Sequence, residues 1–307
     1  MKTQPAPSRR QFIQSALCLG AGALAGPNHV VTLAAEPGAP TPWQIGAYTR
    51  PWDQWEYPVA LDAIAEAGFK HAGLMTAKSK TWVIITHETP AEEATRIGQE
   101  VSKRGLQLLS LYAGEFPVAQ SLEAGIAGLK RLIDNCAACN SPNLMLAGTT
   151  DPKLYASYFK AVAECCDYAA AKKIGLSMKP HGGINATGPQ CRQAIESVGH
   201  KNFRLWYDPG NIFYYSDGQR DPVDDATTVD GLVVGMSVKD FRPPKEVMVT
   251  PGTGKVDFAR VLARLKQGGF TGGPLLVECL ERGELAHVTA EGRKARQFLE
   301  ELAGVKS

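Results

Sequence analysis

The sequence has 307 residues, of which 44% are hydrophobic and 21% charged, which is ordinary for a soluble globular chain and enough for one large α/β domain or two ordinary ones. It contains 33 Lys and Arg residues against 31 Asp and Glu residues. Because this net charge is close to zero, nothing in the composition supports nucleic acid or an anionic membrane surface as a partner.

Residues 1–35 have the pattern of an export signal. The motif Ser-Arg-Arg-Gln-Phe-Ile at 8–13 precedes an apolar, Gly- and Ala-rich run at 15–26, and Leu-Ala-Ala at 33–35 suits a signal peptidase. The pattern resembles a twin-arginine signal, and the apolar run is too short to span a bilayer as a stable anchor. We therefore expect an exported, periplasmic protein without a membrane anchor after cleavage. An uncleaved amphipathic tail is the alternative.

After a Pro- and Gly-rich linker at 36–42, short apolar runs alternate with longer amphipathic runs, and eight such units follow one another. The expected strands are residues 43–47, 71–75, 106–112, 143–147, a run starting at 175, 203–207, 232–238 and 274–279. The expected helices are residues 58–67, 91–104, 122–138, 154–172, 189–197, 222–229, 258–266 and 290–303. Proline near helix starts and glycine after helix ends agree with these boundaries.

The repeated units predict a single (β/α)₈ TIM barrel over residues 43–307. Strands that are too apolar to alternate, each followed by a helix with one apolar face, are typical of a parallel sheet covered on its outer side. An open doubly wound sheet is the alternative. It would place a glycine-rich phosphate motif after the first strand, and the residues at 45–50, Ile-Gly-Ala-Tyr-Thr-Arg, contain none.

Polar side chains follow strands five to eight directly. The motifs are Lys-Pro-His-Gly-Gly at 179–183, Tyr-Asp-Pro-Gly-Asn at 207–211, Ser-Val-Lys-Asp at 237–240 and Leu-Val-Glu at 276–278. Active sites of TIM barrels lie at the carboxyl ends of the strands, so these motifs predict one shared pocket. Its expected members are Lys179, His181, Asp208, Asn211, Lys239, Asp240 and Glu278. Taken singly, each is better explained as a solvated loop charge; it is the series of four similar strand endings that favours a shared site.

This series of strand endings, together with Pro-Gly-Thr-Gly-Lys-Val-Asp-Phe at 251–258, resembles the xylose isomerase-like barrels. That family includes sugar phosphate isomerases, sugar epimerases and the type IV endonuclease, and the resemblance covers essentially the whole mature chain. It implies a divalent metal held by Glu, Asp, His and Glu at the ends of strands five to eight, with the two Glu residues also moving protons. Asp208 and Glu278 match this pattern, whereas Lys179 and Ser237 stand at the other two positions.

These residues are compatible with two kinds of active site, one without a metal and one with a metal. A protonated lysine has no lone pair, so Lys179 would take the place of the metal as a positive charge between Asp208 and Glu278. In the alternative, His181 joins Asp208 and Glu278 as ligands of a Mn, Zn or Mg ion, with water completing the shell.

The resemblance implies a carbohydrate-active isomerase or epimerase that removes a proton next to a sugar carbonyl. Glu278 is the expected base, Lys179 or a metal the group that stabilises the oxyanion, and His181 the expected acid. A desolvated Lys179 could instead form a Schiff base. A lyase or hydratase acting on an oxidised sugar, and a sugar-binding barrel without activity, are the alternatives.

The remaining candidates are expected to bind the substrate, a small carbohydrate or sugar acid. Asn211 suits sugar hydroxyl groups, and Lys239 and Arg242 suit a carboxylate or another anion. Tyr48 and Trp52 follow the first strand and are expected to stack on a sugar face. A structural ion pair between Lys239 and Asp240, and packing of the aromatic residues in the core, are the competing interpretations.

Overall fold

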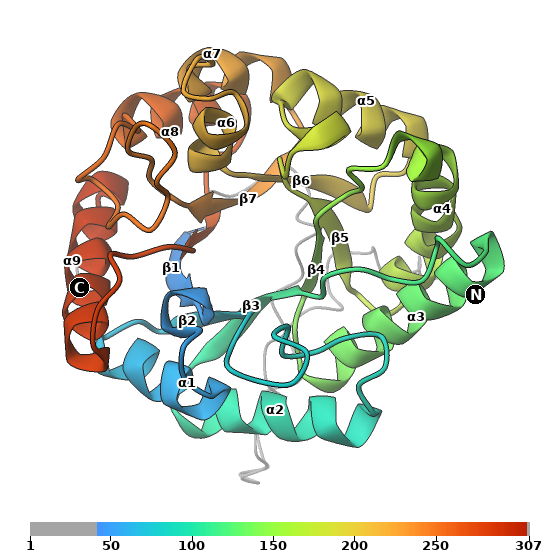
Figure 1. Cartoon of the computed structure of the whole chain (residues 1–307), viewed down its shortest axis with the longest axis horizontal. Helices are drawn as coiled ribbons and strands as arrows, with labels where there is room; N and C mark the ends of the chain where they lie inside the picture. Colours follow the sequence, from blue (N-terminus) through green and yellow to red (C-terminus); the bar gives the residue numbers. More distant parts are fainter. Residues whose placement is uncertain (1–41, 306–307) are drawn as a thin grey trace, which may run out of the picture. The chain divides into compact units, whose positions relative to one another are not determined.

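A computed structural model describes residues 42–305 of the chain. These residues form a closed barrel of parallel strands in the order β1 to β8, with β8 paired to β1 (Figure 1). The predicted (β/α)₈ barrel is therefore confirmed. The predicted signal peptide at 1–35 and nearly all of the linker at 36–42 lie outside the described residues, so export remains a prediction.

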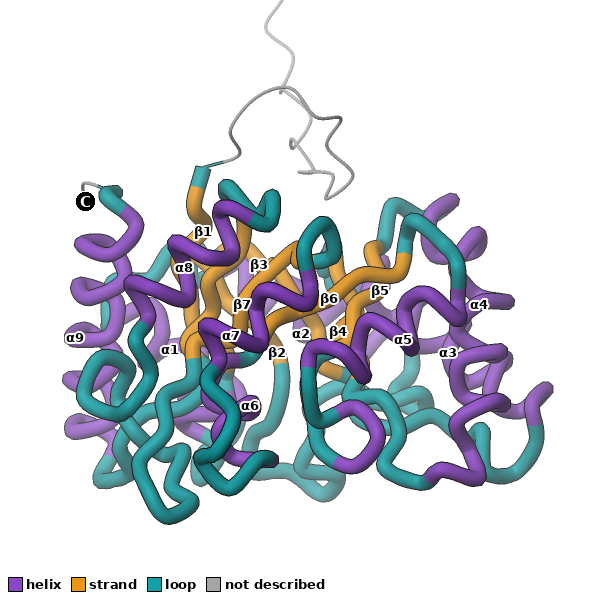
Figure 2. The backbone as a smooth tube through the Cα atoms, turned by 90° about the horizontal axis from the view of Figure 1, so that it is seen from above, coloured by secondary structure: helices purple, strands orange, loops and turns teal. Residues whose placement is uncertain are grey.

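The helices form a layer outside the strands, and long connecting loops gather at the lower edge of the barrel in Figure 2. The strands are β1 (Trp43–Tyr48), β2 (His71–Leu74), β3 (Gln107–Tyr112), β4 (Asn143–Leu146), β5 (Gly175–Met178), β6 (Phe203–Tyr207), β7 (Val233–Val238) and β8 (Gly273–Val277). The helices are α1 (Tyr57–Glu66), α2 (Ala91–Lys103), α3 (Leu122–Ala138), α4 (Tyr155–Ala171), α5 (Gly188–Val198), α6 (Pro209–Tyr215), α7 (Pro222–Ala226), α8 (Phe258–Gln267) and α9 (Leu285–Ala303). None of the helices within 42–305 combines the length and the apolar character that crossing a membrane requires.

Two helices differ from the sequence-based expectation. The short helix α6 was not expected, and it forms because the Asp208 side chain accepts a hydrogen bond from the backbone N–H of Asn211 while Pro209 occupies the first helical position. Helix α9 starts at Leu285, earlier than the expected 290, and its first turn has neither an acidic residue nor a side-chain cap. The sequence around Leu285 therefore gives little indication that a helix begins there.

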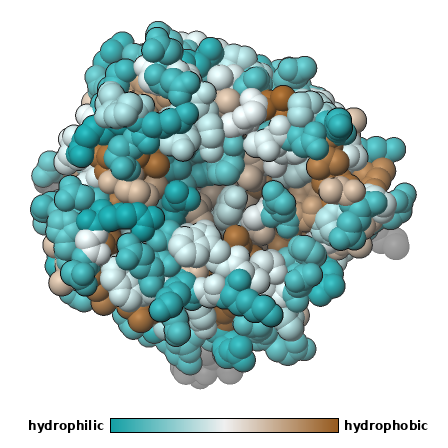
Figure 3. Space-filling model, viewed as in Figure 1, coloured by the Kyte–Doolittle hydropathy of each residue, from teal (hydrophilic) through white to brown (hydrophobic). Residues whose placement is uncertain are grey.

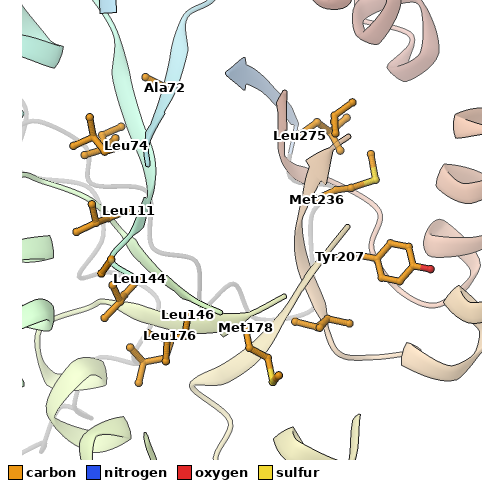
Figure 4. Packing of buried hydrophobic residues seen from close by; sticks show 14 of the residues in the cluster. Ala72, Leu74, Leu111, Leu144, Leu146, Leu176, Met178, Tyr207, Met236 and Leu275 are labelled. Carbon is orange, nitrogen blue, oxygen red and sulfur yellow. The ribbon is translucent and has the colours of Figure 1, made fainter. Parts of the chain in front are cut away.

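The apolar residues form two layers, one on each side of the sheet. The larger layer fills the space between strands and helices, and Figure 4 shows Leu176, Met178, Tyr207 and Met236 pointing away from the barrel axis. The smaller layer lies inside the barrel and consists of Tyr48, Met75, Leu109, Met145, Trp206 and Leu276. Side chains alternate along a strand, so a residue that directly follows a member of the outer layer points into the barrel.

Gly235 of β7 lies directly against the ring of Trp206, which is fully buried inside the barrel. A methyl group at position 235 would meet three indole carbons at 2.5 to 2.7 Å. We expect Gly235→Ala to lower the free energy of unfolding by about 1–3 kcal/mol, the usual cost of overpacking, as measured by urea unfolding. In the Trp206→Phe background the same change should cost less, because phenylalanine lacks these carbons. Equal costs in both backgrounds would contradict this packing.

Candidate active site

Four charged side chains occupy equivalent places at the carboxyl ends of β5 to β8. Lys179, Asp208, Lys239 and Glu278 are each the first residue after their strand. Each follows an outward-facing residue, so the alternation turns all four toward the barrel axis above the inner apolar layer. This end of the barrel faces the viewer in Figures 1 and 3, and the space-filling surface is hollowed near its centre.

The four groups form one network of ion pairs. The Lys179 Nζ atom lies 2.6 and 2.7 Å from the two carboxylate oxygens of Glu278 and 3.2 Å from Oδ2 of Asp208. The Lys239 Nζ atom lies 2.7 Å from Oε1 of Glu278 and 3.1 Å from Oδ2 of Asp208. The sequence-based expectation that the ends of strands five, six and eight meet over one opening agrees with these distances.

This network is almost completely removed from solvent. Asp208 and Glu278 are 0% exposed, Lys179 is 1% exposed and Lys239 is 3% exposed. Two positive and two negative charges balance, and each carboxylate contacts both ammonium groups, which is the condition under which buried charges are tolerated. The alternative interpretation of these residues as solvated loop charges is therefore wrong.

Burial and the neighbouring charges act differently on the two lysines. Burial lowers the pKa of Lys179, and the adjacent Lys239 lowers it further, against the opposing effect of Glu278. Burial also opposes the charge of Lys239, but Asp208 and Glu278 outweigh it and raise its pKa. Burial of Glu278 is likewise outweighed by Lys179, Lys239 and Arg50, which hold its pKa well below the usual range. Of the two amines, Lys239 therefore holds its proton more firmly than Lys179.

The structural ion pair proposed as an alternative for Lys239 and Asp240 does not form. Lys239 turns inward, whereas Asp240 is fully buried in the β7–α8 loop and accepts backbone hydrogen bonds from Phe241, Gly252, Gly254 and Val256 at 2.8 to 3.0 Å. Asp240 is therefore not a member of the central pocket. Its carboxylate satisfies backbone amides of the loop from within, so these amides are not available to a ligand.

Two of the predicted substrate-binding residues have other surroundings than expected. The Asn211 side chain donates to the carbonyl of Pro180 at 2.7 Å and accepts from Lys239 at 2.9 Å, so the protein itself uses both ends of the amide. Arg242 is exposed, and its backbone pairs with Glu246 outside the centre. Asn211 positions Lys239, and the expectation that Arg242 holds an anion in the pocket is corrected.

The two aromatic residues predicted to stack on a sugar are fully buried. Tyr48 lies in the apolar layer inside the barrel, where its hydroxyl contacts the sulfur of Met145 at 3.6 Å. Trp52 packs in the outer layer, and its indole N–H donates to Thr289 of α9 at 3.4 Å. Neither side chain presents a face to a ligand, so the competing interpretation as core aromatics is the correct one for both.

His181 lies above the charged network between two aromatic rings, those of Tyr112 at 6.4 Å and Tyr215 at 5.9 Å. Burial lowers the pKa of His181 to about 3, and the positive charges of Lys179 and Lys239 contribute to the shift. His181 was expected to be an acid with a pKa near neutrality. The imidazole is instead neutral at physiological pH, which does not agree with a role as an imidazolium acid.

The lowered pKa of His181 predicts a loss of stability in acid. An unfolded histidine takes up a proton below its ordinary pKa of 6.5, whereas folded His181 resists protonation down to a pKa of about 3. The unfolded state therefore binds more protons in this window, and stability falls as the pH falls through it. We expect His181→Gln to reduce the loss of unfolding free energy between pH 7 and pH 5, measured by urea unfolding. His200→Gln, at the surface, is the control; equal losses in His181→Gln and the parent would refute the prediction.

The residues at the centre do not fit a divalent metal. The ammonium groups of Lys179 and Lys239 lie where a cation would contact Asp208 and Glu278. Within the part of the chain that the structure describes, no group of three or more His, Cys, Asp or Glu side chains is arranged to hold a metal ion. The proposed ligand set of His181, Asp208 and Glu278 for Mn, Zn or Mg is therefore corrected, and Ser237 leaves a buried hydroxyl without a hydrogen-bond partner where the resemblance implies a histidine.

Arg50 is a residue of the centre that sequence reasoning missed. It begins the 3₁₀ turn after β1, and its guanidinium acts on the pKa values of Glu278, Lys239 and His181. The signal was present, because Arg50 is a charged residue that follows an apolar run and precedes a proline, as Lys179 and Asp208 do.

Comparison with known proteins identifies the class of barrel. The family model described as "Xylose isomerase-like TIM barrel" matches residues 61–302, and the chain belongs to this family. No curated protein sequence matches the chain significantly.

Solved structures of the same fold are similar over most of the chain. A D-psicose 3-epimerase crystallised in the presence of D-fructose has a TM-score of 0.67 and 15% identity, covering 85% of this chain and 99% of its own. A xylose isomerase domain protein from Planctomyces limnophilus has a TM-score of 0.65 and 18% identity, covering 85% and 97%. A D-allulose 3-epimerase from Methylomonas sp. has a TM-score of 0.63 and 18% identity, covering 86% and 99%. At these identities the likeness establishes the fold.

Proposed function

We propose that this protein isomerises or epimerises a carbohydrate by moving a proton at the carbon next to a carbonyl, and that two lysines supply the positive charge for this step. The observation that carries the proposal is the buried network in which Lys179 and Lys239 contact both Asp208 and Glu278 at 2.6 to 3.2 Å. Membership in the xylose isomerase-like family and the sugar epimerases among the similar structures support it.

Glu278 is the proposed base. The adjacent cations hold its pKa well below the usual range, so the carboxylate is ionised at neutral pH. Its Oε1 atom lies 2.6 Å from Lys179 and 2.7 Å from Lys239, and its Oε2 atom accepts a hydrogen bond from Lys179 at 2.7 Å. A carboxylate oxygen accepts two hydrogen bonds, so Oε2 retains a lone pair for a substrate proton.

The two ammonium groups are the proposed oxyanion stabilisers. Removal of a proton next to a carbonyl builds negative charge on the carbonyl oxygen, and fixed cations in a site without water stabilise that charge strongly. Lys239 keeps its proton because Asp208 and Glu278 outweigh its burial and raise its pKa. Lys179 has a lowered pKa and contacts Glu278, so it is placed to pass a proton between the base and the substrate oxygen.

The decisive test is proton exchange in deuterated water. Ketoses, keto-sugars and sugar acids are incubated with the full-length protein, and deuterium at the carbon next to the carbonyl is followed by NMR. We expect exchange with at least one compound, and the same rate after dialysis against a chelator. Absence of exchange across the panel, with the fold intact by circular dichroism, would remove the proposal. Loss of exchange on chelation would overturn the role of the two lysines.

A sugar-binding barrel without turnover is the second candidate. The observation in its favour is that the lysines and carboxylates are almost inaccessible and already paired with one another. This candidate predicts a sugar that raises the melting temperature of the protein but is not converted to a product. The same sugar should raise the melting temperature of Glu278→Gln by the same amount.

A further inference from the structure

We propose that Arg50 binds an acidic group of the substrate, so that the site takes an anionic sugar derivative, a sugar carboxylate or phosphate, in preference to a neutral sugar. This inference names the substrate class for the function proposed above and rests on it. It depends on the position of Arg50, on its buried Nε atom, which has no hydrogen-bond partner among residues 42–305, and on the charge of the centre.

Arg50 lies at the same edge of the barrel as the charged network. Strand β1 pairs with β8 so that Ala47 is beside Val277, and Arg50 and Glu278 follow these residues at the carboxyl ends. The guanidinium influences the pKa values of groups on several strands, including Tyr112, His181 and Lys239. An electrostatic effect on Tyr112 of β3, and on His181 and Lys239, which follow β5 and β7, agrees with a guanidinium at the carboxyl end of the barrel.

The described residues do not satisfy all the hydrogen-bond donors of the Arg50 guanidinium. Its Nε atom is buried and, among residues 42–305, has no hydrogen-bond partner. Asp53, the acid nearest in sequence, pairs with Arg282 at 3.4 Å. The interactions of Arg50 are with the Cys279 thiol and, over longer range, with Glu278 and Asp53. An arginine donor buried without an acceptor is costly, and a ligand oxygen at this place would satisfy it.

The charges at the centre leave a positive excess. Three cations, Arg50, Lys179 and Lys239, face two carboxylates, Asp208 and Glu278. Burial raises the pKa of Cys279, so its thiol is neutral, and burial keeps His181 neutral as well. A ligand carrying one negative charge would balance the site, whereas a neutral sugar would leave the excess.

The chemistry of the guanidinium fits a planar or tetrahedral oxyanion. Its N–H groups form a rigid fork that pairs with two oxygens of a carboxylate or phosphate at once. Tyr112, His181 and Tyr215 are half-buried neighbours of one another, and the Arg50 charge acts on the pKa values of Tyr112 and His181. In this arrangement the acidic group would bind Arg50, while the carbonyl end of the same molecule reaches the two lysines.

Binding of unreactive ligands tests the inference separately from catalysis. Gluconate carries a carboxylate but no aldehyde or ketone group, and glucitol is its neutral counterpart; glucitol 6-phosphate supplies the phosphate arm. By isothermal titration calorimetry we expect the parent protein to bind gluconate or glucitol 6-phosphate about tenfold or more tightly than glucitol. Arg50→Met should abolish this difference, whereas Arg242→Met, which removes an exposed arginine at the same rim, should preserve it.

The two arms identify the acidic group, and the outcomes separate this inference from the proposed function. Preference for gluconate assigns a carboxylate, and preference for glucitol 6-phosphate assigns a phosphate. Equal binding of all three ligands, no measurable binding of either anion, or an unchanged preference in a folded Arg50→Met would overturn the inference. Exchange with a neutral ketose together with no anion preference defeats only the inference. Arg50-dependent anion binding without exchange on any substrate defeats only the proposed function.

Discussion

Replacement of Glu278 by Gln is expected to slow proton exchange on the substrate by about 10²- to 10⁴-fold, the usual contribution of a positioned base. Glutamine has nearly the same shape as glutamate but cannot take up the proton. The measurement is the initial rate of deuterium incorporation at saturating substrate. Glu291→Gln provides the matched control, because Glu291 is also a buried carboxylate paired with a lysine, Lys294 at 2.6 Å, but lies away from the centre.

The Gln variant also leaves two ammonium groups with one carboxylate, so its fold must be checked by circular dichroism. If it does not fold, Glu278→Asp is the second variant, since aspartate keeps the charge and withdraws the oxygens by one carbon–carbon bond. We expect this variant to fold and to exchange slowly. Exchange at the parent rate in either folded variant would exclude Glu278 as the base.

Replacement of Lys179 by Met is expected to lower the free energy of unfolding by about 3–5 kcal/mol, because it leaves part of a buried carboxylate charge uncompensated. Methionine has a similar length and fills most of the same volume, so the change removes the charge rather than the packing. Glu278 would lose its two contacts with Lys179 at 2.6 and 2.7 Å. Urea unfolding at pH 7 measures the cost.

Lys172→Met is the control for this experiment. Lys172 pairs with Asp134 at 3.0 Å, but both side chains are more than one third exposed, so its loss should cost much less than the loss of Lys179. In the double variant Lys179→Met, Glu278→Gln the charges are removed together, and the total cost should be smaller than the sum of the single costs. Strict additivity, or a cost for Lys179→Met no larger than for Lys172→Met, would show that the buried network is not coupled.

The fold and the core of the site follow from local features that a sequence displays. Eight apolar runs separated by amphipathic helices permit few architectures, and parallel strands in a barrel bring their carboxyl ends to one rim. The first residue after each strand then points inward by alternation. This is why Lys179, Asp208 and Glu278 could be brought together from the sequence.

The errors arise where a side chain's surroundings depend on distant strands. Tyr48 and Trp52 lie within a few residues of Arg50, yet Tyr48 faces the interior, Trp52 faces a helix, and Arg50 reaches the centre. A shift of one residue along the chain exchanges these directions. The pairing of Lys239 with Asp208 and Glu278 rather than with its neighbour Asp240 likewise depends on which strand ends lie across the barrel, and this is set by the stagger of the closed sheet.

The carboxylate of Asp240 occupies a ring of four backbone N–H groups in the loop that joins β7 to α8. Many proteins bind a phosphoryl group with such a ring of backbone N–H groups. In this protein the ring is occupied by the fully buried side chain of Asp240, which belongs to the same loop. If the rim binds a charged ligand, these four amides do not take part, and substitution of single side chains such as Arg50 would alter the selectivity while the loop stays as it is.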